Sequence, residues 1–207
     1  MNKMLLRVTG FCALLLSFSA CKPKEINQLA DAGSALKTVF AMETAKVAGA
    51  NKQVVMIVPN ATKGPAAALG GEFKSALQKQ GLSVVEMKPV NLGDPMHYDQ
   101  YGLKADDFFA VLQKHSGVGA IVSLVGAPII QANDVGKIPA THPPVLVIAT
   151  RQIGISLGVP TNPTVLEQML NAKIIQLAVL DGAGSSGKPD EAHKIFDQQF
   201  RILRPNP

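Results

Sequence analysis

Four polar residues of this sequence, Asn60, Thr62, Lys63 and Arg151, have side chains suited to binding an anion. The first three fall in the stretch PNATKG that follows one apolar run, and Arg151 falls in the stretch TRQ that follows another. PNATKG also leads into a segment with helical spacing, and the N–H groups at a helix start favour negative charge. We therefore expect a site for a small anionic ligand. The alternative is that Asn60 and Thr62 only cap turns and that the charged side chains are solvated.

A serine hydrolase triad is the catalytic alternative. The sequence GISLG at residues 154–158 matches the G-x-S-x-G pattern of such enzymes, and Asp181 and His193 follow Ser156 in their chain order. The surroundings do not fit the pattern, because residues 150–153 separate the motif from the preceding apolar run. VPTNP then follows it where a helix should begin. The sequence therefore favours a protein that is not an enzyme.

Two further kinds of site are not expected. GAGSSGKP at residues 182–189 matches the phosphate-binding G-x-x-x-x-G-K pattern, but Pro189 stands where a magnesium-binding Ser or Thr is needed. This stretch also follows the last apolar run instead of the first. The four His residues are scattered and lack the H-E-x-x-H spacing, so we expect no metal site and no cofactor.

The first twenty residues have the three zones of an export signal. Lys3 and Arg7 form a positive start, residues 11–18 form an apolar core, and the small residues Ser19 and Ala20 follow. This core is shorter than the roughly 20 residues that a membrane-spanning helix needs. A cleaved signal peptide over residues 1–20 is therefore predicted.

The sequence FSAC at residues 18–21 resembles the lipobox of bacterial lipoprotein signal peptides, which ends in a lipidated Cys. The resemblance implies that Cys21 becomes the first residue, carries lipid and anchors the protein in a membrane of the cell envelope, facing the periplasm. Lys22 instead of Asp favours the outer membrane. Since Cys12 would leave with the signal, no free thiol remains, which excludes disulfides, thiolate metal sites and a Cys nucleophile.

Composition limits the partners of the mature chain. Cleavage after residue 20 would leave 187 residues, a length suited to one domain with a proper core, and would lower the net charge from +5 to +3. The chain has two Tyr and no Trp, so it offers little for bases to stack on, and we expect no nucleic-acid partner. The expected partners are the membrane, through the lipid, and either a small molecule or an envelope protein.

The elements that must position these residues alternate between strands and helices. Apolar, β-branched runs predict five strands, at residues 53–58, 82–87, 119–125, 144–150 and 174–180. Helical spacing predicts helices at 64–81, with Gly81 as its cap, at 106–115, from Pro163 onward and at 189–199. Before them, residues 21–24 are expected to form a tether and residues 25–50 a helix that docks on the domain.

This alternation predicts an α/β fold, because strand–helix–strand units build parallel sheets with helices on both faces. We expect residues 51–207 to form one domain, a three-layer α/β/α sandwich. Its mainly parallel five-stranded sheet would have the order 2-1-3-4-5, as in flavodoxin-like chains. In this order the ligand site lies at the carboxyl ends of the first and third strands, where the loops at 59–64, 126–128 and 150–152 meet.

Residues 53–181 resemble one lobe of a type I periplasmic binding protein. The resemblance rests on VVMIVPNATKG, on GGEFKSALQKQGLSVV and on GVGAIVSLVGAP followed by PPVLVIAT. In that family the loops after these strands contact a small ligand, such as a sugar or an amino acid, between two lobes. The resemblance therefore implies a solute-binding module whose second wall comes from a partner or a second copy. A structural or assembly role without a ligand is the remaining alternative.

Overall fold

The computed structural model describes most of the chain from Pro23 onward. The described residues are 23–94, 96–97, 101–150, 162–185, 187–188 and 190–206, with side chains described from residue 30.

A six-stranded sheet of order β2-β1-β4-β6-β7-β8 forms the centre of the protein. Its strands are β1 (Gln53–Pro59), β2 (Ser83–Val90), β4 (Ala120–Ser123), β6 (Val145–Ala149), β7 (Leu177–Asp181) and β8 (Phe200–Leu203). The first five pair in parallel, and β8 pairs antiparallel with β7. A second, two-stranded sheet joins β3 (Leu103–Lys104) to β5 (Pro128–Ile129). The predicted order 2-1-3-4-5 is thus confirmed for the five parallel strands.

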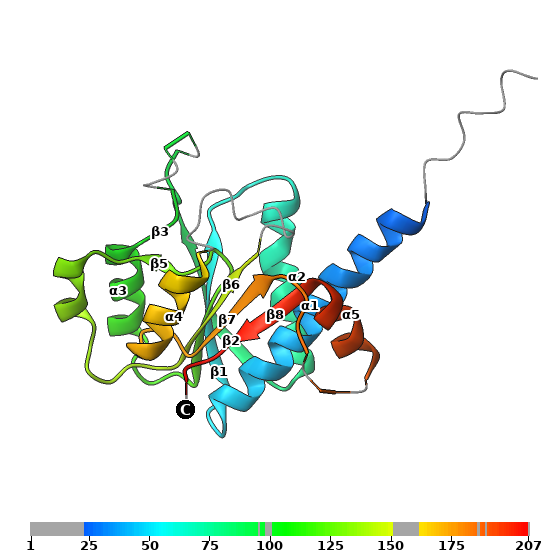
Figure 1. Ribbon diagram of the computed structural model, residues 1–207. Helices are drawn as coiled ribbons and strands as arrows, with labels where there is room; N and C mark the ends of the chain where they lie inside the picture. Colours follow the sequence, from blue (N-terminus) through cyan, green and yellow to red (C-terminus); the bar gives the residue numbers. More distant parts are fainter. Residues whose placement is uncertain are drawn as a thin grey trace, which may run out of the picture.

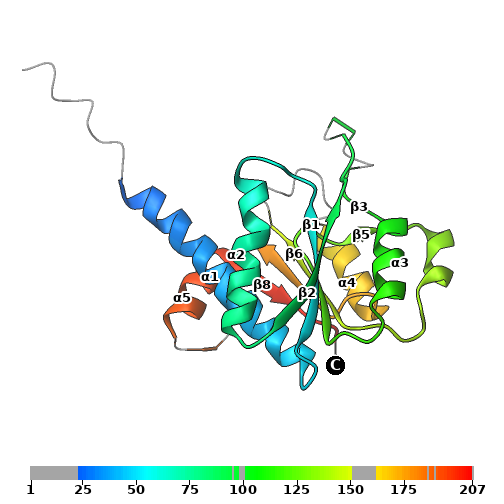
Figure 2. The same ribbon diagram turned by 180° about the vertical axis from the view of Figure 1, so that it is seen from behind.

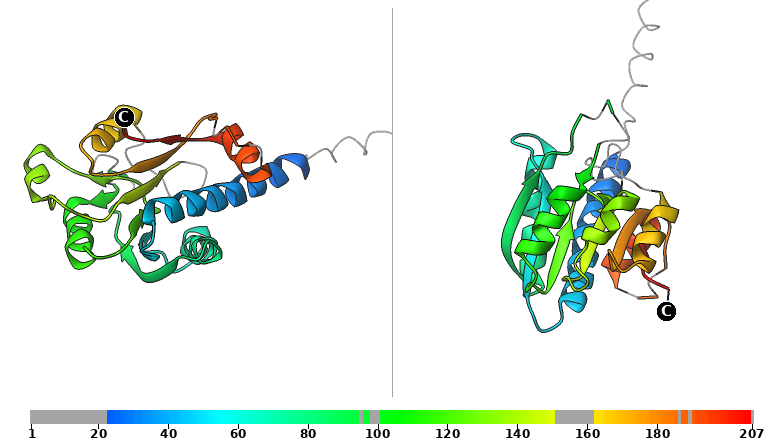
Figure 3. Two further views of the ribbon diagram at one scale, coloured as in Figure 1. Left: turned by 90° about the horizontal axis from the view of Figure 1, so that it is seen from below. Right: turned by 90° about the vertical axis from the view of Figure 1, so that its left-hand side faces the viewer.

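Helices cover both faces of the sheet, as predicted. They are α1 (Pro23–Ala48), α2 (Pro65–Lys79), α3 (Ala105–Lys114), α4 (Pro163–Asn171) and α5 (Glu191–Gln199), with a 3₁₀ helix η1 (Ala132–Lys137). Helices α1, α2 and α5 lie on one side of the sheet and α3 and α4 on the other, as Figures 1 and 2 show from opposite directions. Seen along the strands, the sheet lies between these two layers (Figure 3, left).

Burial on both faces explains why the strands are continuous apolar runs. All residues of β4 and β6 are buried, whereas the edge strand β2 is partly exposed along its length. A parallel sheet covered by helices on both sides requires this composition, since neither face meets water.

Helix α2 ends where the sequence predicts, at a left-handed glycine. Gly81 has φ +76° and its N–H donates to the Gln78 carbonyl at 2.9 Å. The Leu82 N–H donates to the Leu77 carbonyl at 3.2 Å, which completes a Schellman motif. Leu77 and Leu82 are both buried, so the turn also delivers the chain into β2.

Helix α1 docks on the sheet, as predicted. Leu36, Val39 and Phe40 are fully buried, and the Phe40 ring meets Phe73 of α2 edge-on at 6.0 Å. The helix begins at Pro23, within the predicted tether and two residues before its own predicted start. Its first turns extend beyond the body of the domain on the side of the carboxyl ends of the parallel strands (Figure 1).

The predicted number of five strands is wrong, because residues 200–203 form β8. FRIL follows α5 directly, with no Gly, Pro or Asn to separate a helix from a strand. Phe200 packs on Phe196 of α5 with ring centroids 5.3 Å apart and is fully buried. Residues 200–203 are too few for their pattern to predict a strand, and they form one because they pair with β7. Among the described residues, no helix is long and apolar enough to cross a bilayer.

Candidate functional site

The strand order reverses between β1 and β4, as predicted. From β1 the chain crosses through α2 to β2 on one side, and from β2 it crosses through α3 to β4 on the other side of β1. In open α/β sheets the loops that leave such a pair at the carboxyl ends diverge and leave room for a ligand. We call this end of the sheet the carboxyl edge and the opposite end, where the parallel strands begin, the amino edge.

Residues 60–64 form the loop that follows β1 at the carboxyl edge. The Asn60 N–H donates to the Val90 carbonyl at 2.9 Å, which ties the loop to the end of β2. The side chains of Asn60, Thr62 and Lys63 are exposed there. These three predicted residues therefore share one short loop beside the switch point.

Arg151, the fourth predicted residue, lies outside the described residues, as does the rest of the segment 151–161. Thr150, the last described residue before that segment, is buried at the end of β6. Strands β6 and β4 are adjacent, so Arg151 follows a strand of the same edge. Its convergence with Lys63 stays a prediction.

The start of α2 offers fewer amide donors than the sequence suggests. Gly64 precedes the helix with φ +76°, no side chain caps it, and no acidic residue occupies the first turn. Pro65, however, has no N–H, and the Ala67 N–H already donates to the Gly64 carbonyl at 3.1 Å. Attraction for an anion at this loop therefore depends more on the Lys63 ammonium than on the helix start.

The loop after β4 is apolar and buried at the carboxyl edge. The hydroxyl of the buried Ser123 donates to the Gly126 carbonyl at 2.6 Å, and Gly126 turns the chain with φ +84°. Ala127 and Pro128 are buried, and Pro128 begins β5. The predicted loop 126–128 is thus at the edge, but its described side chains supply no charge.

Two residues of the alternative serine triad are described, and Ser156 is not. Asp181 is half-buried at the end of β7. The His193 imidazole is buried, with Nδ1 2.7 Å from the Asp190 carboxylate and Nε2 3.3 Å from the Lys188 ammonium. The Lys188 ammonium can only donate hydrogen bonds, so in this arrangement His193 Nε2 accepts from Lys188 and His193 Nδ1–H donates to Asp190. The triad stays a prediction.

A buried charge cluster centred on Glu43 was not predicted. The Glu43 side chain is 4% exposed and accepts from Lys46 at 2.6 Å, Arg204 at 2.6 Å and Lys188 at 3.2 Å. Burial alone would raise the pKa of Glu43, but hydrogen bonds from Lys46, Arg204 and Lys188 outweigh it and lower the pKa to about 2. The cluster ties α1 to the loop before α5 and to the segment after β8.

The position of Glu43 could have been found from helical spacing. It lies seven residues after Leu36 and three after Phe40, so it continues the buried stripe of α1. A carboxylate on a buried stripe requires cationic partners. One partner, Lys188, is the Lys of the phosphate-binding pattern, and its ammonium faces Glu43 and His193.

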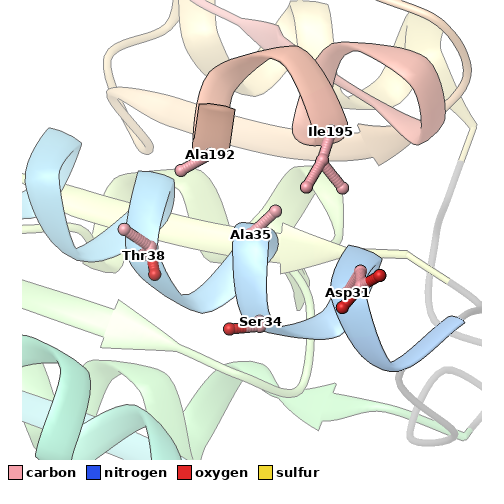
Figure 4. A pocket seen from close by; sticks show the side chains of 6 residues that line it. All are labelled: Asp31, Ser34, Ala35, Thr38, Ala192 and Ile195. Atoms are coloured by element: carbon pink, nitrogen blue, oxygen red, sulfur yellow. The ribbon is translucent and has the colours of Figure 1, made fainter. Parts of the chain in front are cut away.

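A shallow hollow of about 190 Å³ lies between α1 and α5. Ala192 and Ile195 project from α5 toward α1, and Ala35 faces them, while Asp31 and the hydroxyls of Ser34 and Thr38 line the α1 side (Figure 4). Small side chains on both helices leave this space unfilled. In the part of the chain that the structure describes, no group of three or more His, Cys, Asp or Glu could hold a metal ion.

Comparison with known proteins places the chain in no family. No family model matches it, and no curated protein matches its sequence. The solved structures to which the chain is similar include periplasmic and ABC-transporter substrate-binding proteins, at TM-scores below 0.5.

Three of these structures illustrate the likeness. The periplasmic ribose ABC transporter of Conexibacter woesei DSM 14684 has 16% sequence identity and a TM-score of 0.44, over 72% of this chain and 45% of that chain. The glucose-galactose binding protein GanP of Geobacillus stearothermophilus has 12% identity and a TM-score of 0.44, over 86% of this chain and 60% of that chain. The arabinose binding protein AraP of the same organism has 13% identity and a TM-score of 0.48, over 86% of this chain and 61% of that chain. The chain spans about half to three-fifths of the length of these proteins.

Proposed function

We propose that this chain is a lipid-anchored protein of the cell envelope whose α/β domain binds a small anionic solute at the carboxyl edge. The observation that carries the proposal is the reversal of strand order between β1 and β4, with Asn60, Thr62 and Lys63 exposed in the loop beside it. Such a reversal is where ligands bind in open α/β sheets.

The chemistry of the loop points to a carboxylate or a similar anion. Lys63 supplies a charge, and Asn60 and Thr62 supply an amide and a hydroxyl that orient a polar group. Arg151 would add a planar, bidentate donor from the neighbouring strand end, the geometry that carboxylates prefer.

A ligand screen on the mature protein tests the proposal. Thermal stability is measured with panels of small carboxylates, amino acids and sugars, since a solute at 100 times its dissociation constant adds about 2.7 kcal/mol to the free energy of unfolding. Any ligand found is then titrated by calorimetry into Lys63→Ala and Arg151→Ala. Both variants should bind it more weakly while keeping their stability within about 0.5 kcal/mol.

Lys52→Ala is the matched control, because Lys52 is exposed at the opposite end of the same strand, β1. It removes the same charge from the protein but not from the carboxyl edge. Unchanged binding in both Lys63→Ala and Arg151→Ala, or an equal loss in Lys52→Ala, would place the site elsewhere.

The anchor is tested separately with Cys21→Ala. We expect this variant to leave the membrane fraction and the detergent phase, because the acyl chains contribute about 0.8 kcal/mol for each buried CH₂. Mass spectrometry of the native protein should find Cys21 modified and residues 1–20 absent. An unmodified Cys21, or an intact N-terminal segment on the mature protein, contradicts the lipoprotein assignment.

A further inference from the structure

Most loops at the amino edge carry cations and no carboxylates; the exception is the segment of Lys188, which also carries Asp190. Six other segments meet there, at residues 49–52, 79–83, 114–119, 138–144, 171–176 and 204–206, and none contains Asp or Glu. The exposed cations of this edge are Lys46, Lys52, Lys79, Lys114, Lys173 and Arg204. By contrast, the carboxyl edge mixes Lys63 with Asp94 and Asp181. The domain is therefore electrically polar along its strands.

Three carboxylates come close to the cations of the amino edge, and each has a partner. Asp190, in the segment that carries Lys188, lies 2.7 Å from His193 Nδ1. Glu43 is buried under Lys46, Lys188 and Arg204, so that three cations face one negative charge. Glu86 of β2 pairs with Lys114 and with His115, whose Nε2 lies 3.1 Å away. These pairs leave a positive excess at the edge.

Three lysines of the edge make no ion pair with any described residue. Lys52, Lys79 and Lys173 are exposed, and none of the salt bridges among the described residues includes them. Their ammonium groups are therefore available to a partner from outside the chain.

Helix dipoles explain part of this arrangement. Lys46, Lys79 and Lys114 lie in the last turns of α1, α2 and α3, where a cation stabilises a helix by about 0.3–1 kcal/mol. Lys52 and Arg204, however, belong to no helix. Nor does a helix dipole require that six loops exclude acidic residues. A surface that meets negative charge does require it, because like charges across an interface cost affinity.

We propose that the amino edge is an electrostatic docking surface for an acidic polymer with carboxylates spaced along its chain. The cations come from separate loops along a six-stranded sheet, which at about 4.8 Å between strands extends about 24 Å. A single small anion cannot contact charges so far apart, whereas a polymer can. Figure 3 (left) views this edge of the sheet.

The position of α1 decides between a polymer and a bilayer. This helix begins on the side of the carboxyl edge (Figure 1), so a lipid on Cys21 would turn the amino edge away from the membrane that holds it. This step rests on the anchor of the proposed function, whereas the charge distribution does not. The surface would then face away from that membrane, where a carboxylate-bearing polymer can reach it and the anchoring bilayer cannot.

Binding of fluorescent poly-glutamate to the purified mature protein tests the inference. Anisotropy is measured at about 50 mM salt and again at about 500 mM, where screening should abolish an electrostatic complex. The triple variant Lys52→Gln/Lys79→Gln/Lys173→Gln should bind at least about tenfold more weakly than the wild type. Its melting curve verifies that it is folded.

The matched control is Lys104→Gln/Lys194→Gln/Arg201→Gln, which removes three exposed charges from elsewhere on the domain. It should lose less than about threefold in affinity. Equal losses in the two triples would show attraction by net charge alone and overturn the inference. No binding by the wild type at low salt would also overturn it, and so would binding to phosphatidylglycerol vesicles without binding to poly-glutamate. Loss of the solute site has no bearing on these outcomes, because none of the six substitutions lies in residues 60–64 or at Arg151.

Discussion

Replacing Glu43 by Gln should destabilise the protein by about 3 kcal/mol at neutral pH. The substitution keeps the size of the side chain and removes its charge, so Lys46, Lys188 and Arg204 would face a buried neutral amide. Breaking a buried ion pair typically costs about 3–5 kcal/mol. The side chains of the three cations are between 37% and 52% exposed and can turn toward water, which places the expected cost at the lower end.

The pKa of Glu43 gives an independent magnitude. Lowering it from 4.5 to about 2 corresponds to about 3 kcal/mol, at about 1.4 kcal/mol for each pKa unit. Because the pKa is lower in the folded protein, this stability is fully present above 4.5 and is lost as the pH falls toward about 2. For a domain of this length, about 3 kcal/mol lowers the melting temperature by roughly 6–12 °C.

The assay is urea unfolding of the wild type and Glu43→Gln at several pH values. At about pH 7 the two should differ by about 3 kcal/mol, and the difference should shrink between about pH 5 and the lowest pH at which both remain folded. The shrinkage follows because protonated Glu43 is, like Gln, a neutral group among the same three cations.

Glu72→Gln is the matched control for this experiment. Glu72 also pairs with a lysine of α1, Lys37, at 2.6 Å, but its side chain is 50% exposed. Its loss should change the free energy of unfolding by no more than about 0.5 kcal/mol. The reasoning is refuted if Glu43→Gln matches Glu72→Gln at neutral pH, or if the gap to the wild type stays constant as the pH is lowered.

Three other changes have defined outcomes. Gly119→Ala should cost at least about 3 kcal/mol in chemical unfolding, because its Cβ would lie 1.8 Å from the Asn51 carbonyl oxygen, whereas Gly117→Ala, with open space around it, should be tolerated. Phe40→Ala should cost about 3–5 kcal/mol by the same measurement, since it empties the contact between α1 and α2; a cost under about 1 kcal/mol would mean that α1 is not docked as described. Melting curves with chelator or reductant should superimpose on those without, and a shift of several degrees would reveal a metal or a disulfide.

The parallel sheet can be predicted from the sequence because the signals for its strands and helices are local. Each of the five parallel strands is an apolar run bounded by turn residues, and Gly81 marks the end of α2 by the left-handed conformation that glycine adopts without strain. The order of the strands then follows from the limited number of right-handed crossover arrangements.

Long-range contacts account for what the sequence did not reveal. β8 depends on pairing with β7, and the Glu43 cluster depends on Lys188 and Arg204, which are 145 and 161 residues away in the chain. No local pattern carries that information. The candidate site could be predicted in part, because parallel topology alone brings Asn60, Thr62 and Lys63 to the carboxyl edge.

The early start of α1 bears on how the proposed lipid anchor would hold the domain. Only Lys22 separates Cys21 from the helix, and the first buried side chain described on α1 is Ala32. The nine residues from 23 to 31 form a rod of about 13 Å, at about 1.5 Å for each residue. With lipid on Cys21, this helical segment would act as a short rigid spacer between the membrane and the domain, and not as a flexible linker. The carboxyl edge would then sample a thin layer of solution next to the bilayer, at nearly fixed orientation, and would capture solute arriving along the membrane surface.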